Sequence, residues 1–143
     1  MQVVDLLATG TAQGVKQDPT QVTKAPKMTK EHGAIDWRRT AAEVCNHVRA
    51  MQPWPTPYTF WHRPGQQPVR VIVLKGMART GAEAAAAGTI LVQSDLSKLS
   101  VVAGDGGIVD ITELQPAGKK RMNAAEFLRG RRPQPGDRLG PET

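Results

Sequence analysis

The sequence predicts a mainly β domain, a small closed or partly open barrel of five short strands with one helix on each flank. Five segments rich in aromatic and β-branched residues follow one another closely, each bounded by turn residues. They span residues 58–61, 69–74, 89–92, 99–103 and 108–114. Two flanking segments, residues 40–51 and 123–131, instead have apolar residues at helical spacing. Short strands at such close spacing are typical of small barrels.

Each predicted helix begins with a capping box, in which an N-cap side chain and a glutamate three residues later satisfy backbone N–H groups. Thr40 and Glu43 form this pair in the first helix, and Asn123 and Glu126 form it in the second. Apolar residues then line one face of each helix. They are Val44, Cys45, Val48 and Met51 in the first helix, and Ala124, Phe127 and Leu128 in the second.

Turn residues separate the predicted strands. The sequence RPGQ at residues 63–66 predicts a hairpin between the first two strands. The sequence GDGG at residues 104–107 predicts another hairpin turn, because it lacks the lysine and the following serine or threonine of a phosphate-binding loop. Residues 76–88 contain four consecutive alanines between glycines, and we expect a flexible loop there.

The chain divides into three parts. Residues 1–26 contain a short helical stretch followed by a polar linker that glycine and proline interrupt. Residues 27–132 form the barrel domain. Residues 133–143 show no hydrophobic period and predict an irregular tail. Because the linker begins almost at residue 1, we expect it to follow another domain in the intact protein.

Positive charge is concentrated near the C-terminus. The formal net charge is +6, and residues 118–143 contribute seven basic and three acidic groups to it, or +4. The basic residues lie on a turn and at the end of the second predicted helix, rather than on a loose tail. Such a cluster can hold several phosphates, so a polyanionic partner is expected. The alternative is a solvated basic face that only favours solubility.

The sequence predicts no catalytic or metal site. The three histidines are widely spread and the single cysteine has no partner at metal-ligand spacing. Cys45 and His47 lie two residues apart on a predicted helix and so face different directions, which favours a packed core cysteine over a nucleophile. Glu43 is explained by capping, and nothing brings it and Asp36 to one cleft.

The sequence also predicts a cytoplasmic protein without a membrane partner. Cys45 is the only cysteine, so no internal disulfide can form and a reducing compartment is expected. No apolar run reaches the length of a membrane span, and the N-terminus lacks the features of a signal peptide.

Five aromatic residues lie within 25 positions of one another. They are Trp37, Trp54, Tyr58, Phe60 and Trp61. Any of them could stack on an unpaired base. Core and helix-anchoring positions are favoured, because a small barrel needs its large side chains inside.

Several ordered motifs of the chain resemble the C-terminal domain of the bacterial methionyl-tRNA formyltransferases. The motifs are APKMTKE at residues 25–31, IDW at 35–37, PWP at 53–55, GTIL at 88–91, GDG at 104–106 and LQPAGKKRM at 114–122. The sequence departs from the family pattern at Met51 and Gln52, where Phe-Asn is usual, and at Ala87, where a proline is usual. These differences bear on local loop shape.

The resemblance implies an open five-stranded barrel of the OB type, joined by the linker to an N-terminal Rossmann-like catalytic domain. In this family the catalytic domain transfers a formyl group from 10-formyltetrahydrofolate to the methionine amino group of initiator methionyl-tRNA. The barrel and linker offer positive surface to the tRNA. The catalytic residues of the family lie in the catalytic domain, so no residue of this chain inherits a catalytic, cofactor or metal-binding role.

The partners implied are therefore initiator methionyl-tRNA and the protein's own catalytic domain. The residues expected to bind RNA are the basic residues of the C-terminal stretch and two linker lysines. They are Lys119, Lys120, Arg121, Arg129, Arg131, Arg132, Lys24 and Lys27. Two alternatives stay open: the same domain from a formyltransferase acting on a nucleotide sugar or a folate, and a free-standing barrel that binds proteins.

Overall fold

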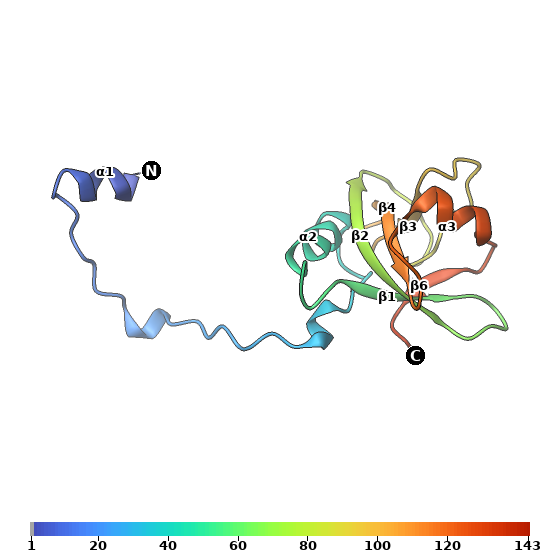
Figure 1. The fold of residues 1–143 in the computed structure, drawn as a ribbon, viewed down its shortest axis with the longest axis horizontal. Helices are drawn as coiled ribbons and strands as arrows, with labels where there is room; N and C mark the ends of the chain where they lie inside the picture. Colours follow the sequence, from blue (N-terminus) through green and yellow to red (C-terminus); the bar gives the residue numbers. More distant parts are fainter. Residues whose placement is uncertain (1) are drawn as a thin grey trace.

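A computed structural model describes residues 2–143 as a barrel that carries a long N-terminal extension (Figure 1). The helices are α1 (Gln2–Ala8), α2 (Ala41–Ala50) and α3 (Ala124–Gly130), with 3-10 turns at Pro19–Gln21 and Lys30–Gly33. The strands are β1 (Tyr58–His62), β2 (Val69–Arg79), β3 (Leu99–Val102), β4 (Ile108–Pro116), β5 (Met122–Asn123) and β6 (Arg138–Gly140). The expected mainly β fold with two flanking helices is confirmed.

The strands form one antiparallel sheet in the order β3-β4-β2-β1-β6, and the short β5 pairs with β4. Residues 88–91 close this sheet into a barrel by bridging its two outer strands. The Gly88 N–H donates to the Val102 carbonyl at 2.8 Å, and the Gly88 carbonyl accepts from the Leu139 N–H at 2.7 Å. Backbone hydrogen bonds from one short segment therefore reach both β3 and β6.

The fifth strand of the sheet is not the one that the sequence predicts. Residues 89 and 90 make isolated bridges only, whereas β6 lies in the predicted irregular tail and pairs with β1. The expectation of an irregular tail is therefore wrong for residues 138–140. A strand of three residues is too short to show an alternating pattern, and it is ordered by contacts with distant residues.

The contacts that dock the tail include a buried ion pair. The Asp137 carboxylate accepts from Arg63 Nη2 at 2.8 Å and from the Gln134 N–H at 3.0 Å. Arg63 also donates to the carbonyl of Arg132 at 2.7 Å, and Leu139 is buried in the barrel core. The barrel domain thus extends beyond residue 132.

The core lies inside the barrel and beneath the two capped helices. Both predicted capping boxes are present, at Thr40 with Glu43 and at Asn123 with Glu126. The apolar face of α2 packs on β2 and β4, and that of α3 packs on β4 and β5. Cys45 is buried in this core as expected, and burial raises the pKa of its thiol.

The hairpin turn between β3 and β4 anchors the start of α2. The Asp105 carboxylate accepts from the Ala41 N–H at 3.2 Å, and the Gly104 N–H donates to the Arg39 carbonyl at 2.8 Å. A Cβ atom on Gly104 would lie 1.8 Å from the carbonyl oxygen of Arg38, so this close approach requires glycine. The predicted turn at residues 104–107 is confirmed.

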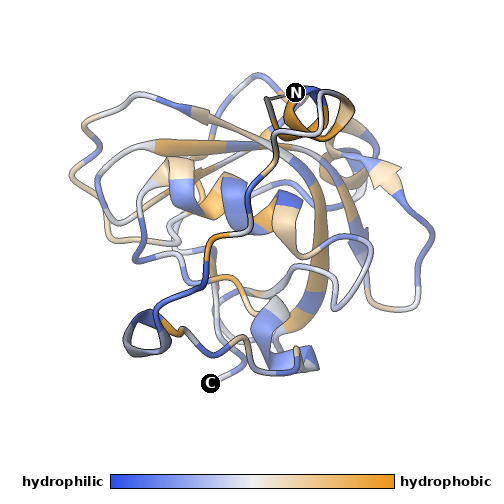
Figure 2. Ribbon diagram, turned by 90° about the vertical axis from the view of Figure 1, so that its left-hand side faces the viewer, coloured by the Kyte–Doolittle hydropathy of each residue, from blue (hydrophilic) through white to orange (hydrophobic). Residues whose placement is uncertain are grey.

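The N-terminal extension is exposed along its length and runs away from the barrel (Figure 1). Figure 2 colours much of α1 as hydrophobic, and Val3, Val4 and Leu7 are each about two-thirds exposed, at 66%, 67% and 65%. Among the described residues, no helix has both the length and the apolar character needed to cross a bilayer.

The docked tail gives a stability prediction. Replacing Asp137 with alanine leaves the nearly buried Arg63 guanidinium without its carboxylate, so the free energy of unfolding should fall by about 3 to 5 kcal/mol. Urea denaturation followed by tryptophan fluorescence measures this loss, since Trp61 lies opposite Leu139 of β6. Glu142→Ala, an exposed carboxylate of the same tail, is the matched control and should leave the transition unchanged. Equal stabilities for the two variants would show that β6 does not hold the barrel.

Candidate nucleic-acid interface

The basic turn between β4 and β5 presents two lysines to solvent on a well-held backbone. The Lys119 N–H donates to the Pro116 carbonyl at 3.1 Å, and the Gln115 side-chain amide donates to the Lys119 carbonyl at 3.0 Å. Gly118 has a φ of 69°, which a tight turn of this kind requires. Lys119 and Lys120 are exposed, and neither enters an ion pair among the described residues. Their charges are therefore available to a partner.

Arg121 follows these lysines but is already paired. Its Nε donates to Glu113 Oε2 at 2.9 Å, and its Nη2 forms a second contact with the same oxygen. This pair lies across the β4–β5 hairpin and reduces the positive charge that Arg121 offers to a partner. The structure thus divides the predicted basic run into two free lysines and one paired arginine.

The remaining basic residues of the C-terminal stretch gather at the other end of α3. Arg129 and Arg132 are exposed, and Arg131 is half-buried. The seven residues of α3 separate them from the turn by about 10 Å along the helix axis. Because Phe127 and Leu128 are buried beneath the helix, this spacing is fixed by the core.

The two linker lysines are not brought to this cluster. Lys24 and Lys27 are exposed on the extended segment that approaches the barrel (Figure 1), and no side-chain hydrogen bond or ion pair of the described residues involves either one. Their place in the predicted RNA-binding set stays a prediction.

A groove of about 800 Å³ on the outer face of β1 was missed by the sequence analysis. Its walls include Lys30, Tyr58, Phe60, Arg70, Ala117 and Pro141. The Ala117 N–H donates to the Arg70 carbonyl at 2.9 Å, so the groove borders the basic turn directly. Ala117 belongs both to the groove wall and to the turn that carries the two exposed lysines.

Aromatic side chains meet in this groove in defined geometry. The Tyr58 and Phe60 rings pack edge to face, with centroids 6.1 Å apart and planes at 85°. The guanidinium carbon of Arg70 lies 4.2 Å from the centroid of the Tyr58 ring. This cation–π contact holds the Arg70 side chain flat on the groove wall.

Only some of the five aromatic residues of the 25-residue window lie in the core, as the sequence predicted for all of them. Trp37 and Trp61 are buried, whereas Trp54 is 53% exposed. Tyr58 and Phe60 are half-buried and alternate with inward-facing Thr59 and Trp61. Alternation along a strand is the signal that could have separated the two kinds of aromatic residue.

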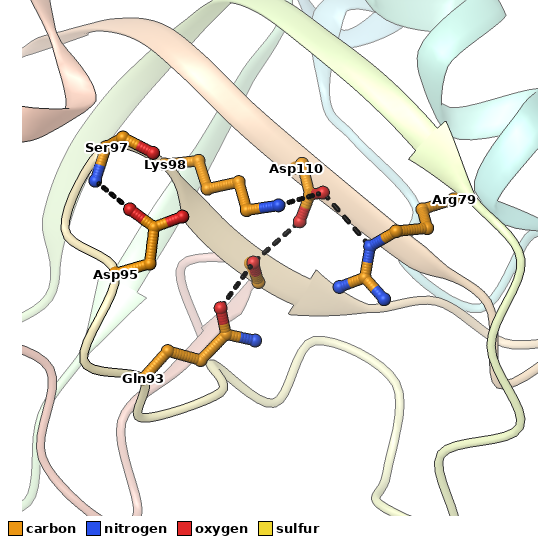
Figure 3. Close-up of polar contacts among 7 residues, drawn as sticks. Arg79, Gln93, Asp95, Ser97, Lys98 and Asp110 are labelled. Carbon is orange, nitrogen blue, oxygen red and sulfur yellow. Dashed lines mark hydrogen bonds and ion pairs between the residues drawn. The ribbon is translucent and has the colours of Figure 1, made fainter.

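A second polar cluster lies on the outer face of β3 and β4, around Asp110 (Figure 3). Its carboxylate accepts from Ser100 at 2.6 Å, from Lys98 at 3.0 Å and from Arg79 at 3.2 Å. Ser100 is only 2% exposed although it lies on this outer face, so β3 is buried on both faces. Asp95 adds a second carboxylate nearby (Figure 3). The two negative charges of Asp110 and Asp95 therefore equal the two positive charges of Lys98 and Arg79.

Burial alone would raise the pKa of Asp110. Hydrogen bonds from Ser100, Lys98 and Arg79 outweigh burial and hold the pKa of this carboxyl below its ordinary value. The cluster therefore ties β2, β3 and the loop before β3 together through an ionised Asp110. It is a structural site.

Within residues 2–143 as described, no group of three or more histidine, cysteine or acidic side chains is placed to hold a metal ion. The groove on β1 has only one carboxylate, that of the exposed Glu142.

Comparison with known proteins gives a consistent family match. A family model described as "Formyl transferase, C-terminal domain" matches residues 27–132. The chain is 37% identical over 139 residues to a methionyl-tRNA formyltransferase of Bacillus velezensis, and 40% identical over 139 residues to one of Bacillus cereus. Each alignment covers 97% of this chain and 42% of the relative. The chain therefore spans about two fifths of the length of these relatives.

The Asp110 cluster gives a prediction for pH dependence. Because the pKa of Asp110 is depressed in the folded state, its stabilising contribution is present above the ordinary value of 3.8 and is lost as the pH falls through the folded pKa. Asp110→Asn should therefore lower the free energy of unfolding by about 1 to 3 kcal/mol at neutral pH. The difference from wild type should shrink at pH values below 3.8.

Urea denaturation at a series of pH values measures this difference. Asp95→Asn removes an exposed carboxylate that caps the Ser97 N–H at 2.9 Å, and it should cost less stability at neutral pH. If the free energy of unfolding of Asp110→Asn stayed below that of the wild type by the same amount at the lowest pH values, the assignment of an ionised Asp110 would be contradicted.

Proposed function

Because the chain belongs to the family of formyl transferase C-terminal domains, we propose that it is the tRNA-binding C-terminal domain of a methionyl-tRNA formyltransferase. The observation that carries the proposal is the exposed pair Lys119 and Lys120, held on a rigid turn with no acidic partner among the described residues. The names of the relatives support the choice of methionyl-tRNA over a nucleotide sugar or a folate as the partner.

The proposed partner is initiator methionyl-tRNA. In the intact protein, the reaction moves a formyl group from 10-formyltetrahydrofolate to the methionine amino group, and an N-terminal catalytic domain performs it. The cytoplasm is the proposed compartment, in keeping with a free, buried Cys45. The barrel contributes affinity and orientation, and no catalytic step is assigned to its residues.

Two basic groups on a fixed frame suit the RNA backbone. Phosphate contacts position a nucleic acid but carry little sequence information. The turn lysines and the arginines at the end of α3 are separated by about 10 Å, so they can meet different phosphates of one tRNA. Binding by this domain alone should therefore be weak, salt-dependent and poorly selective among tRNAs.

The salt dependence of tRNA binding tests the two lysines. Removing one lysine–phosphate interaction should flatten the slope of log affinity against log salt by about 0.7 to 0.9. The double variant Lys119→Ala/Lys120→Ala should therefore flatten the slope by about 1.4 to 1.8. Arg121→Ala should have a smaller effect, because Glu113 already pairs with Arg121.

The matched control removes the same charge from other exposed positions outside the linker, as in Arg39→Ala/Lys75→Ala. This control should retain a steeper slope than the turn variant. Circular dichroism should show intact folding for all variants, since exposed charges away from caps and core contribute little to stability. If the two double variants had equal slopes, the turn lysines would not be part of the RNA-binding surface.

A second prediction concerns catalysis. The isolated chain should not formylate methionyl-tRNA when supplied with 10-formyltetrahydrofolate, because we assign the catalytic step to the N-terminal domain of the intact protein and no step to the barrel. Incorporation of labelled formyl groups, with a full-length methionyl-tRNA formyltransferase as the positive control, measures this. Turnover by the purified chain above the enzyme-free rate would refute the assignment of catalysis to the N-terminal domain and of tRNA binding to the barrel.

A further inference from the structure

We propose that the groove on β1 is a stacking site for an unpaired base of the bound RNA, next to the phosphate-binding turn. The inference rests on the proposed function for the choice of RNA as partner and adds a second kind of contact to it. The base would lie against Phe60, and the flanking phosphates would meet Arg70 and the turn lysines.

The register of the sheet places a residue without a side chain beside Phe60. Phe60 lies opposite Arg70 on β2 and opposite Gly140 on β6. Arg70 lies over the Tyr58 ring, and Gly140 has no side chain. Gly140 is itself buried, but it lines the groove together with Phe60 and Pro141, so the proposed base would reach the aromatic ring over the backbone of β6.

The charge of the groove suits a nucleic-acid strand. Its charged walls are Lys30 and Arg70 against the single carboxylate of Glu142, which leaves a net positive charge. Neither Lys30 nor Arg70 forms an ion pair among the described residues. Aromatic side chains beside basic groups are the usual surface for unpaired bases, because every base has a face that can stack.

The position of the groove disfavours an added peptide strand. Such a strand binds through the unpaired backbone groups of a sheet edge, but β1 is hydrogen-bonded to β2 on one side and β6 on the other. An occupant of the groove must therefore be recognised by side chains. The aromatic side chains of the groove can stack on a planar group, and its basic side chains can attract a negatively charged one.

The test uses a single-stranded RNA of about eight nucleotides that carries 2-aminopurine, a length within the range that barrels of this size bind. Fluorescence of the modified base reports stacking, and anisotropy of an end label reports affinity. Phe60→Leu keeps the groove wall apolar but removes the ring, and it should weaken binding by about 5-fold to 150-fold. Phe60→Tyr should restore affinity close to that of wild type.

A second variant blocks the groove without removing any aromatic ring. A Cβ atom on Gly140 would lie 3.7 Å from Arg138 Nη1 and 3.8 Å from His62 Nε2, which is ordinary contact, so the Cβ of Gly140→Val has room, and its methyl groups would fill part of the groove that Gly140 lines. It should weaken binding and abolish the change in 2-aminopurine fluorescence. Both groove variants should keep the wild-type salt slope, because they remove no charge.

An abasic strand of the same length has the same charge but no bases. Its affinity for the wild type should be as low as the affinity of the normal strand for Phe60→Leu. Equal affinity of the wild type for the two strands, or unchanged affinity in both groove variants, would overturn the stacking site. A flatter salt slope in the turn variant together with unchanged groove variants would support the phosphate-binding turn and reject the stacking site. The experiments can therefore reject either proposal without rejecting the other. The proposed function depends on the turn lysines, whereas the stacking site depends on Phe60.

Discussion

Closure of the barrel by residues 88–91 is the constraint on which the rest of the structure depends. These residues lie between β3 and β6, and hydrogen bonds reach both strands from Gly88. A Cβ atom at Gly88 would lie 2.2 Å from the Leu139 carbonyl oxygen, and the φ of Gly88 is 86°. Only glycine allows the two backbones to approach so closely. Without this closure the outer edges of β3 and β6 would expose unpaired N–H and C=O groups.

Closure in turn depends on the C-terminal tail. β6 is held by β1 along one edge and by the closing segment along the other, and the Arg63–Asp137 pair fixes the chain just before it. The same arrangement shapes the groove, because β6 contributes Gly140 opposite Phe60. A segment without a visible hydrophobic period is thus necessary both for the fold and for the surface proposed to bind RNA.

The barrel displays positive charge at fixed positions rather than as a diffuse basic region. The turn lysines are held by backbone and side-chain hydrogen bonds, and the arginines beyond α3 are held by the buried Phe127 and Leu128. Arg121 and Arg63 belong to the same basic composition but are engaged with Glu113 and Asp137. Net charge therefore overstates the number of groups that are free to meet phosphates.

Local signals in the sequence were sufficient for the helices, the hairpin turns, four of the five main strands and the basic turn. A capping box or a turn residue acts on neighbours a few positions away, which is why Thr40, Asn123 and Gly106 could be interpreted from the sequence alone. The tertiary structure decided which strand completes the barrel and which arginines are paired. Those outcomes depend on contacts between residues far apart in the chain, such as Arg63 with Asp137 and Gly88 with Leu139, and no local pattern contains them.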